Sequence, residues 1–150
     1  ALPILTDFVF TDVAVNSKNQ VFSGNYAVVA DENGYFLIDQ KGKACFEKRF
    51  PNAKGMEGGY YAVADESGQW GFADEKGELV VPCQYVDAYS FSNQTAAVQY
   101  AGKWGYINRY GNMVIDAQFS TALPFLNGKA MVQDDQENIK VLELRYFDTF

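Results

Sequence analysis

The sequence predicts an all-β fold built from tandem repeats of about 34 residues. Residues 102–111 are repeated as residues 68–77, and again in a weaker form as residues 33–42. A fixed period of this size indicates a repeat architecture. The chain also has 13 Gly residues and 16% aromatic residues, which suit tight turns and pleated strands. Short apolar runs alternate with turns rich in Asp, Ser, Asn and Gly, as in β-proteins.

Each repeat is predicted to form a three-stranded meander. The first strand carries an apolar triplet in every repeat: Ala27-Val28-Val29, Ala62-Val63-Ala64, Ala96-Ala97-Val98 and Ala130-Met131-Val132. The repeated stretch itself supplies the second strand. The third strand follows at residues 79–81 and 113–115, with residues 44–46 as a weaker counterpart.

A connector joins each meander to the next. It contains an aromatic residue, an Ala three positions later, and a Met or Phe three positions after that: Phe50, Ala53, Met56; Tyr85, Ala88, Phe91; Phe119, Ala122, Phe125. By period, Phe22 corresponds to Met56. A spacing of three predicts a turn of helix or an irregular crossing that places an aromatic side chain under the next meander.

The turn after the second strand has a specific chemistry. Asp39, Asp74 and Asn108 each precede a glycine by three residues, the glycines being Gly42, Gly77 and Gly111. A short polar side chain accepts backbone hydrogen bonds at the start of a type I turn. The glycine then takes the left-handed conformation that closes the hairpin with a bulge.

The repeated Trp-Gly pair is predicted to be structural. Trp70-Gly71 and Trp104-Gly105 lie inside predicted strands, where glycine costs roughly 0.5–1 kcal/mol relative to alanine. We expect each glycine to admit a neighbouring backbone or ring on the face opposite the tryptophan. We expect both indoles to be mostly buried between meanders, with each N–H donating to a backbone carbonyl.

These repeats are assigned to one domain, residues 1–150. Residues 1–21 are a lead-in or N-terminal cap, the repeats span 22–55, 56–90 and 91–124, and residues 125–150 form a degenerate C-terminal repeat or cap. In the last copy Asn138-Ile139 stands where Trp-Gly is expected, and terminal repeats commonly differ because they face water. The meanders are expected to stack into an open, elongated array. A small closed propeller or barrel is the alternative.

Composition restricts the chemistry. The net charge of −7 opposes binding to nucleic acid, and no apolar run approaches the roughly 18 residues that a membrane-spanning helix needs. The chain has no histidine, so Ser-His and Cys-His catalytic pairs are impossible. We therefore predict no catalytic residues, no metal ligands and no cofactor.

Cys45 and Cys83 fall at different phases of the repeat, which favours two separate thiols. A disulfide bond between them stays an open alternative.

The repeat resembles the bacterial WG-repeat family across roughly residues 22–133. The match is strongest at Trp70-Gly71 and Trp104-Gly105, and Pro82, Tyr85 and Asp87 also fit the family pattern. Tyr35-Phe36 and Asn138-Ile139 depart from it. The resemblance implies a β-rich array in bacterial proteins, frequently attached to other domains and without a general enzymatic activity. Because the sequence does not begin with Met, we expect processing or excision from a larger protein, with extracytoplasmic placement as one option.

These observations predict a non-catalytic binding or scaffold module that contacts a protein or a cell-surface polymer. The alternative is a carbohydrate-binding module that uses exposed tyrosines, for which the candidates are Tyr89, Tyr100 and Tyr110. Tyr100 and Tyr110 stand in turns where the second copy has Glu66 and Lys76, so the core does not require them. An enzyme that uses carboxylates alone is the third class.

Overall fold

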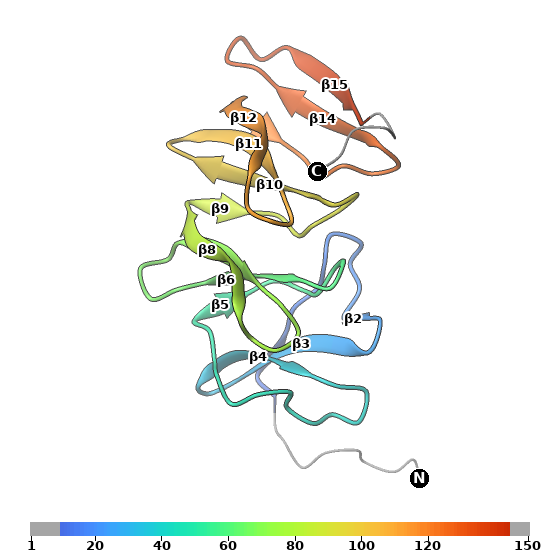
Figure 1. Ribbon diagram of the computed structural model, residues 1–150, viewed down its shortest axis with the longest axis vertical. Helices are drawn as coiled ribbons and strands as arrows, with labels where there is room; N and C mark the ends of the chain where they lie inside the picture. The colour runs from blue at the N-terminus through green and yellow to red at the C-terminus, as the bar shows by residue number, and fades with distance from the viewer. Residues whose placement is uncertain (1–9, 145–150) are drawn as a thin grey trace.

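The computed structural model describes residues 10–144 as four antiparallel sheets stacked along one axis (Figure 1). The first sheet contains β1 (Asp12–Val13), β2 (Phe22–Ser23), β3 (Tyr26–Asp31) and β4 (Gly34–Ile38). The second contains β5 (Asn52–Ala53), β6 (Tyr61–Ala64), β7 (Trp70–Ala73) and β8 (Leu79–Tyr85). The third contains β9 (Asp87–Ala88), β10 (Thr95–Tyr100), β11 (Lys103–Asn108) and β12 (Met113–Phe119), and the fourth β13 (Thr121–Ala122), β14 (Lys129–Gln133) and β15 (Ile139–Glu143).

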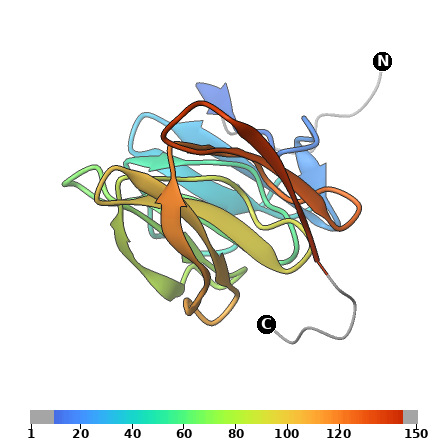
Figure 2. The same cartoon turned by 90° about the horizontal axis from the view of Figure 1, so that it is seen from above.

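The predicted elongated array of β-meanders is confirmed. The sheets follow one another in chain order along the long axis, and Figure 2 shows them lying over one another with their strands in different directions. None of the four sheets closes on itself, so the described residues do not adopt the barrel alternative. They also include no helix long and apolar enough to cross a membrane.

The connectors contain short strands in place of the predicted turn of helix or irregular crossing. β5, β9 and β13 each contain two residues that pair with the first long strand of the following meander. Ala53, Ala88 and Ala122 in these strands are buried, so their backbone groups need partners that sheet pairing supplies. β1 has the same role in the first sheet. Asp12 of β1 pairs with Ala30 of β3, just as Asn52 of β5 pairs with Ala64 of β6.

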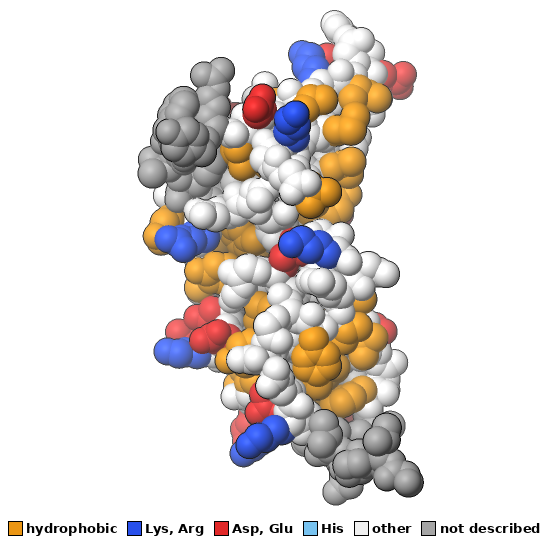
Figure 3. Space-filling view, turned by 90° about the vertical axis from the view of Figure 1, so that its right-hand side faces the viewer, with side chains coloured by type: hydrophobic (Ala, Val, Ile, Leu, Met, Phe, Trp, Pro, Cys, Tyr) orange, Lys and Arg blue, Asp and Glu red, His pale blue; other side chains and the backbone are white. Residues whose placement is uncertain are grey.

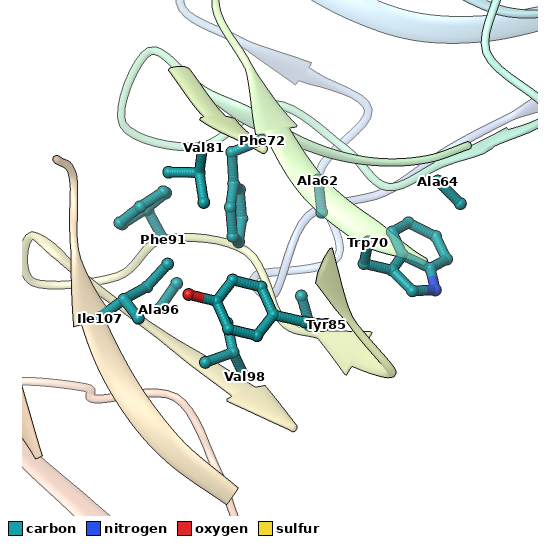
Figure 4. Packing of buried hydrophobic residues seen from close by; sticks show 11 residues of the cluster. Ala62, Ala64, Trp70, Phe72, Val81, Tyr85, Phe91, Ala96, Val98 and Ile107 are labelled. Carbon is teal, nitrogen blue, oxygen red and sulfur yellow. The ribbon is translucent and has the colours of Figure 1, made fainter. Parts of the chain in front are cut away.

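Three apolar layers lie between successive sheets. Met56, Phe91 and Phe125 enter one layer each, and none is more than 3% exposed. Phe22, at the same phase of the repeat, is 49% exposed because no described sheet lies on the outer side of the first one. Figure 4 shows the layer between the second and third sheets, where the ring centroids of Phe91 and Phe72 are 4.5 Å apart.

The hairpins of the second and third sheets differ in the length of their turns. β10 and β11 are joined by a two-residue turn, with Tyr100 paired to Lys103, whereas β6 and β7 are joined by residues 65–69. The strand pairings place Val28, Ala62, Ala97 and Met131 at one structural position. The predicted alignment of the second triplet with the others is therefore wrong by one residue, which in a strand means the opposite face.

Candidate functional site

The Trp-Gly pairs have the structural geometry expected of them. Trp70 and Trp104 are each 9% exposed. A Cβ atom on Gly71 would lie 2.4–2.8 Å from backbone atoms of residues 81–83, and one on Gly105 would lie 2.6–2.8 Å from backbone atoms of residues 115–117. The third strand bulges here, since Trp70 pairs with Tyr85 while Phe72 pairs with Val81. The predicted close approach of a neighbouring backbone is confirmed.

Each indole contacts a side chain of the connector that precedes it along the chain. The Lys54 ammonium lies 4.9 Å from the centroid of the Trp70 ring, and it donates to the Asp87 carboxylate (3.2 Å) and to the Ala88 carbonyl. The ring centroids of Trp104 and Tyr89 are 5.3 Å apart. Neither indole N–H has a hydrogen-bond partner among residues 10–144, and the Trp70 nitrogen points away from the other labelled side chains (Figure 4). The expected carbonyl partner is therefore wrong.

The Gly-closed turns also form as predicted. Gly42, Gly77 and Gly111 have φ angles of 78°, 80° and 86°. In each turn the Oδ1 atom of the first residue accepts two backbone N–H groups, as Asp74 does from Lys76 (2.9 Å) and Glu78 (3.1 Å). The same turn recurs at residues 16–20, 65–69 and 134–138, with Asn19 and Glu137 in the left-handed position.

These hydrogen bonds explain the acidic residues at the turn heads. The Ser67 hydroxyl and nearby backbone amides lower the pKa of Asp65, and the Asn138 amide lowers the pKa of Asp134. Asp39 and Asp74 bind backbone amides in the same way. The carboxylates considered for an enzyme therefore have a structural role. Residues 10–144 hold no group of three or more side chains suited to a metal ion.

The two cysteines are free thiols, as favoured from their phases. Cys45 is exposed and Cys83 is half-buried, with its thiol 3.7 Å from the Val63 carbonyl oxygen. Burial raises the pKa of both thiols, so they are less reactive than an ordinary surface cysteine.

The three candidate tyrosines do not form one site. Tyr100 and Tyr110 are 53% and 64% exposed, while Tyr89 is half-buried against Trp104. Tyr100 ends β10 and Tyr110 lies in the turn after β11, so the two are at opposite ends of β11, a strand roughly 20 Å long. Tyr110 accepts a hydrogen bond from the guanidinium group of Arg109 (3.1 Å), and Arg109 reaches a groove that the sequence did not reveal.

This groove runs beside a column of stacked turns. The turns are closed by the bridges Glu57–Tyr60, Ser92–Thr95 and Leu126–Lys129. They lie on the right in Figure 1, and Figure 3 shows this side with a broken band of hydrophobic side chains and, near its middle, basic and acidic side chains close together. The groove has a volume of about 270 Å³ and is lined by Lys18, Glu57, Gly58, Tyr60, Phe91, Ser92, Asn93, Gln94, Arg109, Leu126 and Asn127. We call it the turn groove.

The acidic and basic residues of the turn groove differ in whether they have a partner. Glu57 is only 7% exposed, and both of its carboxylate oxygens accept from the Ser17 hydroxyl at 2.7 Å. Lys18 and Arg109 form no ion pair with a carboxylate in the described part of the chain. Two basic groups in a chain with net charge −7 are thus available to an anionic ligand.

One turn in the column departs from the others. Asn93 and Gln94 have φ angles of 52° and 65°, where the second sheet has Gly58 and Gly59. A left-handed conformation costs a residue other than glycine roughly 1–2 kcal/mol. The Asn93 side chain offsets part of this cost by accepting the N–H of Gly128 (3.0 Å). The replacement of two glycines by Asn93 and Gln94 was the one signal in the sequence that marked this groove.

Comparisons with known proteins identify the repeats and find solved structures with a similar fold. The family described as "WG containing repeat" matches residues 70–104 and 104–137. No curated protein matches the chain.

Solved structures show a similar fold. The computationally designed Ika4 protein has a TM-score of 0.56 at 11% identity, covering 93% of this chain and 94% of that one. BamB from Moraxella catarrhalis has a TM-score of 0.55 at 15% identity, and the designed Ika8 protein 0.52 at 10%. The match with BamB covers 88% of this chain and 45% of BamB. The match with Ika8 covers 93% of this chain and 48% of Ika8. From its own motifs and from the family match, the part of the chain over residues 70–137 consists of WG repeats.

Proposed function

We propose that this protein is a non-catalytic binding module and that its turn groove takes a segment of an acidic polysaccharide, such as a cell-surface polymer. The observation that carries the proposal is the pair of unpaired basic groups, Lys18 and Arg109, in one groove of an acidic protein. An extracytoplasmic location follows from this ligand and is part of the same proposal.

Arg109 is suited to a carboxylate of the ligand. A guanidinium group donates two parallel hydrogen bonds to a carboxylate, which gives both affinity and orientation. The contact between Arg109 and the Tyr110 ring, 5.1 Å from its centroid, limits the freedom of the guanidinium and reduces the entropy lost on binding. Tyr110 therefore supports the site through Arg109, and Tyr100 lies at the far end of β11.

The remaining groove residues are suited to the body of a sugar. Tyr60 is half-buried, and its ring centroid lies 5.5 Å from that of the buried Phe91, so the ring is fixed in position. A fixed aromatic ring can stack on the apolar face of a sugar. The amides of Gln94 and Asn127 supply donors and acceptors for hydroxyl groups.

Calorimetric titration tests this proposal. We expect acidic polysaccharides to bind and neutral ones to bind more weakly, with Arg109→Ala lowering the affinity for acidic polymers about tenfold or more because it removes a charge-assisted contact. Lys76→Ala is the matched control, since Lys76 occupies the position of Tyr110 in the preceding repeat and lies outside the groove.

Two outcomes would overturn the assignment. A flat response to every polysaccharide would remove the polymer ligand and leave a protein partner as the subject of a new search. An equal loss of affinity in Arg109→Ala and Lys76→Ala would show general charge attraction and remove the turn groove as the site.

A further inference from the structure

We propose that two copies of this chain associate through the outer face of the fourth sheet. In the first three sheets the face directed toward the next sheet is covered by that sheet. Val28, Ala62 and Ala97 occupy one position on these faces, and each is 0% exposed. Met131 occupies the same position in the fourth sheet and is 49% exposed.

Three neighbouring positions repeat this contrast. Val141 is 60% exposed where Tyr106 of the third sheet is fully buried. Strand pairing places Ile139 at the tryptophan position, so the predicted match of Asn138 is wrong by one residue, and Ile139 is 66% exposed where Trp104 is 9% exposed. Leu123, which donates its N–H to the Met131 carbonyl (3.0 Å), is 45% exposed. Because Met131 pairs directly with Val141, these side chains form one apolar surface, the end face.

The charges on the end face favour a second copy as the occupant. Lys129 pairs with Glu143 two positions along from the Met131–Val141 pair, so both lie on this face. The face is therefore neutral in a chain that carries a net charge of −7. A surface with one cation, one anion and an apolar centre is complementary to itself under a two-fold rotation.

The opposite end of the array is built differently: Val13 and Phe22 are each 49% exposed on the outer side of the first sheet, but the centre of that face is covered. Ala27, Val29, Phe36 and Ile38 of the first sheet are at most 5% exposed. The Arg49 guanidinium also lies 3.5 Å from the centroid of the Phe36 ring. A two-fold contact of the end face with itself brings Lys129 of one copy beside Glu143 of the other, so we expect the association to close as a dimer.

The size of the end face sets the strength of the contact. Three strands spaced about 4.8 Å apart, with about five residues at 3.3 Å each, cover roughly 250 Å² per copy. A stable interface buries about 800 Å² per partner, so we expect a weak dimer with a Kd of roughly 0.1–1 mM.

Sedimentation velocity of the full chain, from low micromolar to about 1 mM, tests the proposal. We expect concentration-dependent dimers for the unaltered protein and monomers throughout for the double variant Met131→Lys, Val141→Lys, which places like charges opposite one another. Leu79→Lys is the matched control, because Leu79 is a strand residue with 44% exposure away from the end face, and it should still dimerise.

Far-ultraviolet circular dichroism confirms that each variant is folded, and Ile139→Glu replaces the double variant if that one unfolds. A monomeric wild-type protein at the highest concentration overturns the proposal. So does association that persists in the folded end-face variants, or that is lost equally in Leu79→Lys.

Discussion

At the level of single residues, the glycine and the tryptophan of each Trp-Gly pair have different structural roles. Gly71 and Gly105 leave room for the bulged third strand, whose backbone passes where a Cβ would otherwise lie. Trp70 and Trp104 fill the layer on the opposite side of the same strand. Their adjacency follows from the alternation of side chains in a strand, which places two consecutive residues on two faces.

Substitution of these glycines tests the steric explanation. We expect Gly71→Ala to lower the free energy of unfolding by about 1–3 kcal/mol, because a methyl group must displace the backbone of residues 81–83. Gly102→Ala is the reference for backbone strain alone, since Gly102 has a φ of 82° but nothing within 4 Å of its Cβ position, and it should cost roughly 1–2 kcal/mol. Urea denaturation measures both, and a larger loss for Gly102→Ala would contradict the steric explanation.

Two fully buried tyrosines provide a second residue-level prediction. The Tyr61 hydroxyl has no hydrogen-bond partner within residues 10–144, whereas the Tyr106 hydroxyl donates to the Leu123 carbonyl (2.7 Å). Burial raises the pKa of both phenols. Tyr106→Phe should cost about 1 kcal/mol, while Tyr61→Phe should be neutral or stabilising. Thermal unfolding compares the two, and a clear loss in Tyr61→Phe would refute this assignment.

The elements of this fold are held in place by their turns. Six turns share one hydrogen-bond pattern, in which an Asp or Asn side chain accepts the amides two and four residues later. Strands of four to seven residues and connectors of two could otherwise pair in several registers. The repeated turn restricts each hairpin to one register.

The Asp65 turn should make stability depend on pH. Its hydrogen bonds lower the pKa of Asp65 in the folded state below the unfolded value of about 3.9. The stabilisation is therefore fully present above about pH 4 and is lost as the pH falls through the folded-state pKa. Asp65→Asn keeps the acceptor without titrating, as Asn108 does in the third sheet.

Urea unfolding of the wild type and of Asp65→Asn across this range measures the effect. We expect the stability difference between them to shrink as the pH falls. Asp116→Asn, which removes an exposed carboxylate from β12, controls for net charge. A difference that does not change with pH would mean that the turn does not couple protonation to folding.

At the scale of the whole molecule, the sequence predicted the period, the Gly-closed turns and the buried indoles. Those features depend on local chemistry that is written in each copy, such as Asp74 followed by Gly77. The pairing of β5 with β6 was not predictable, because two residues have no period and their partner is selected by burial. The turn groove was missed for a related reason: Lys18, Tyr60 and Arg109 come from different turns and meet only through stacking.

The open ends of the array have a consequence for its evolution. In a ring-shaped fold the number of units is fixed by the angle needed to close the circle, so the gain or loss of one unit strains all the others. Here the substantial contacts between described elements join only neighbouring sheets of the stack, and none of them joins the first sheet to the fourth. Duplication or deletion of a 34-residue unit would lengthen or shorten the column while leaving the geometry of the remaining units intact.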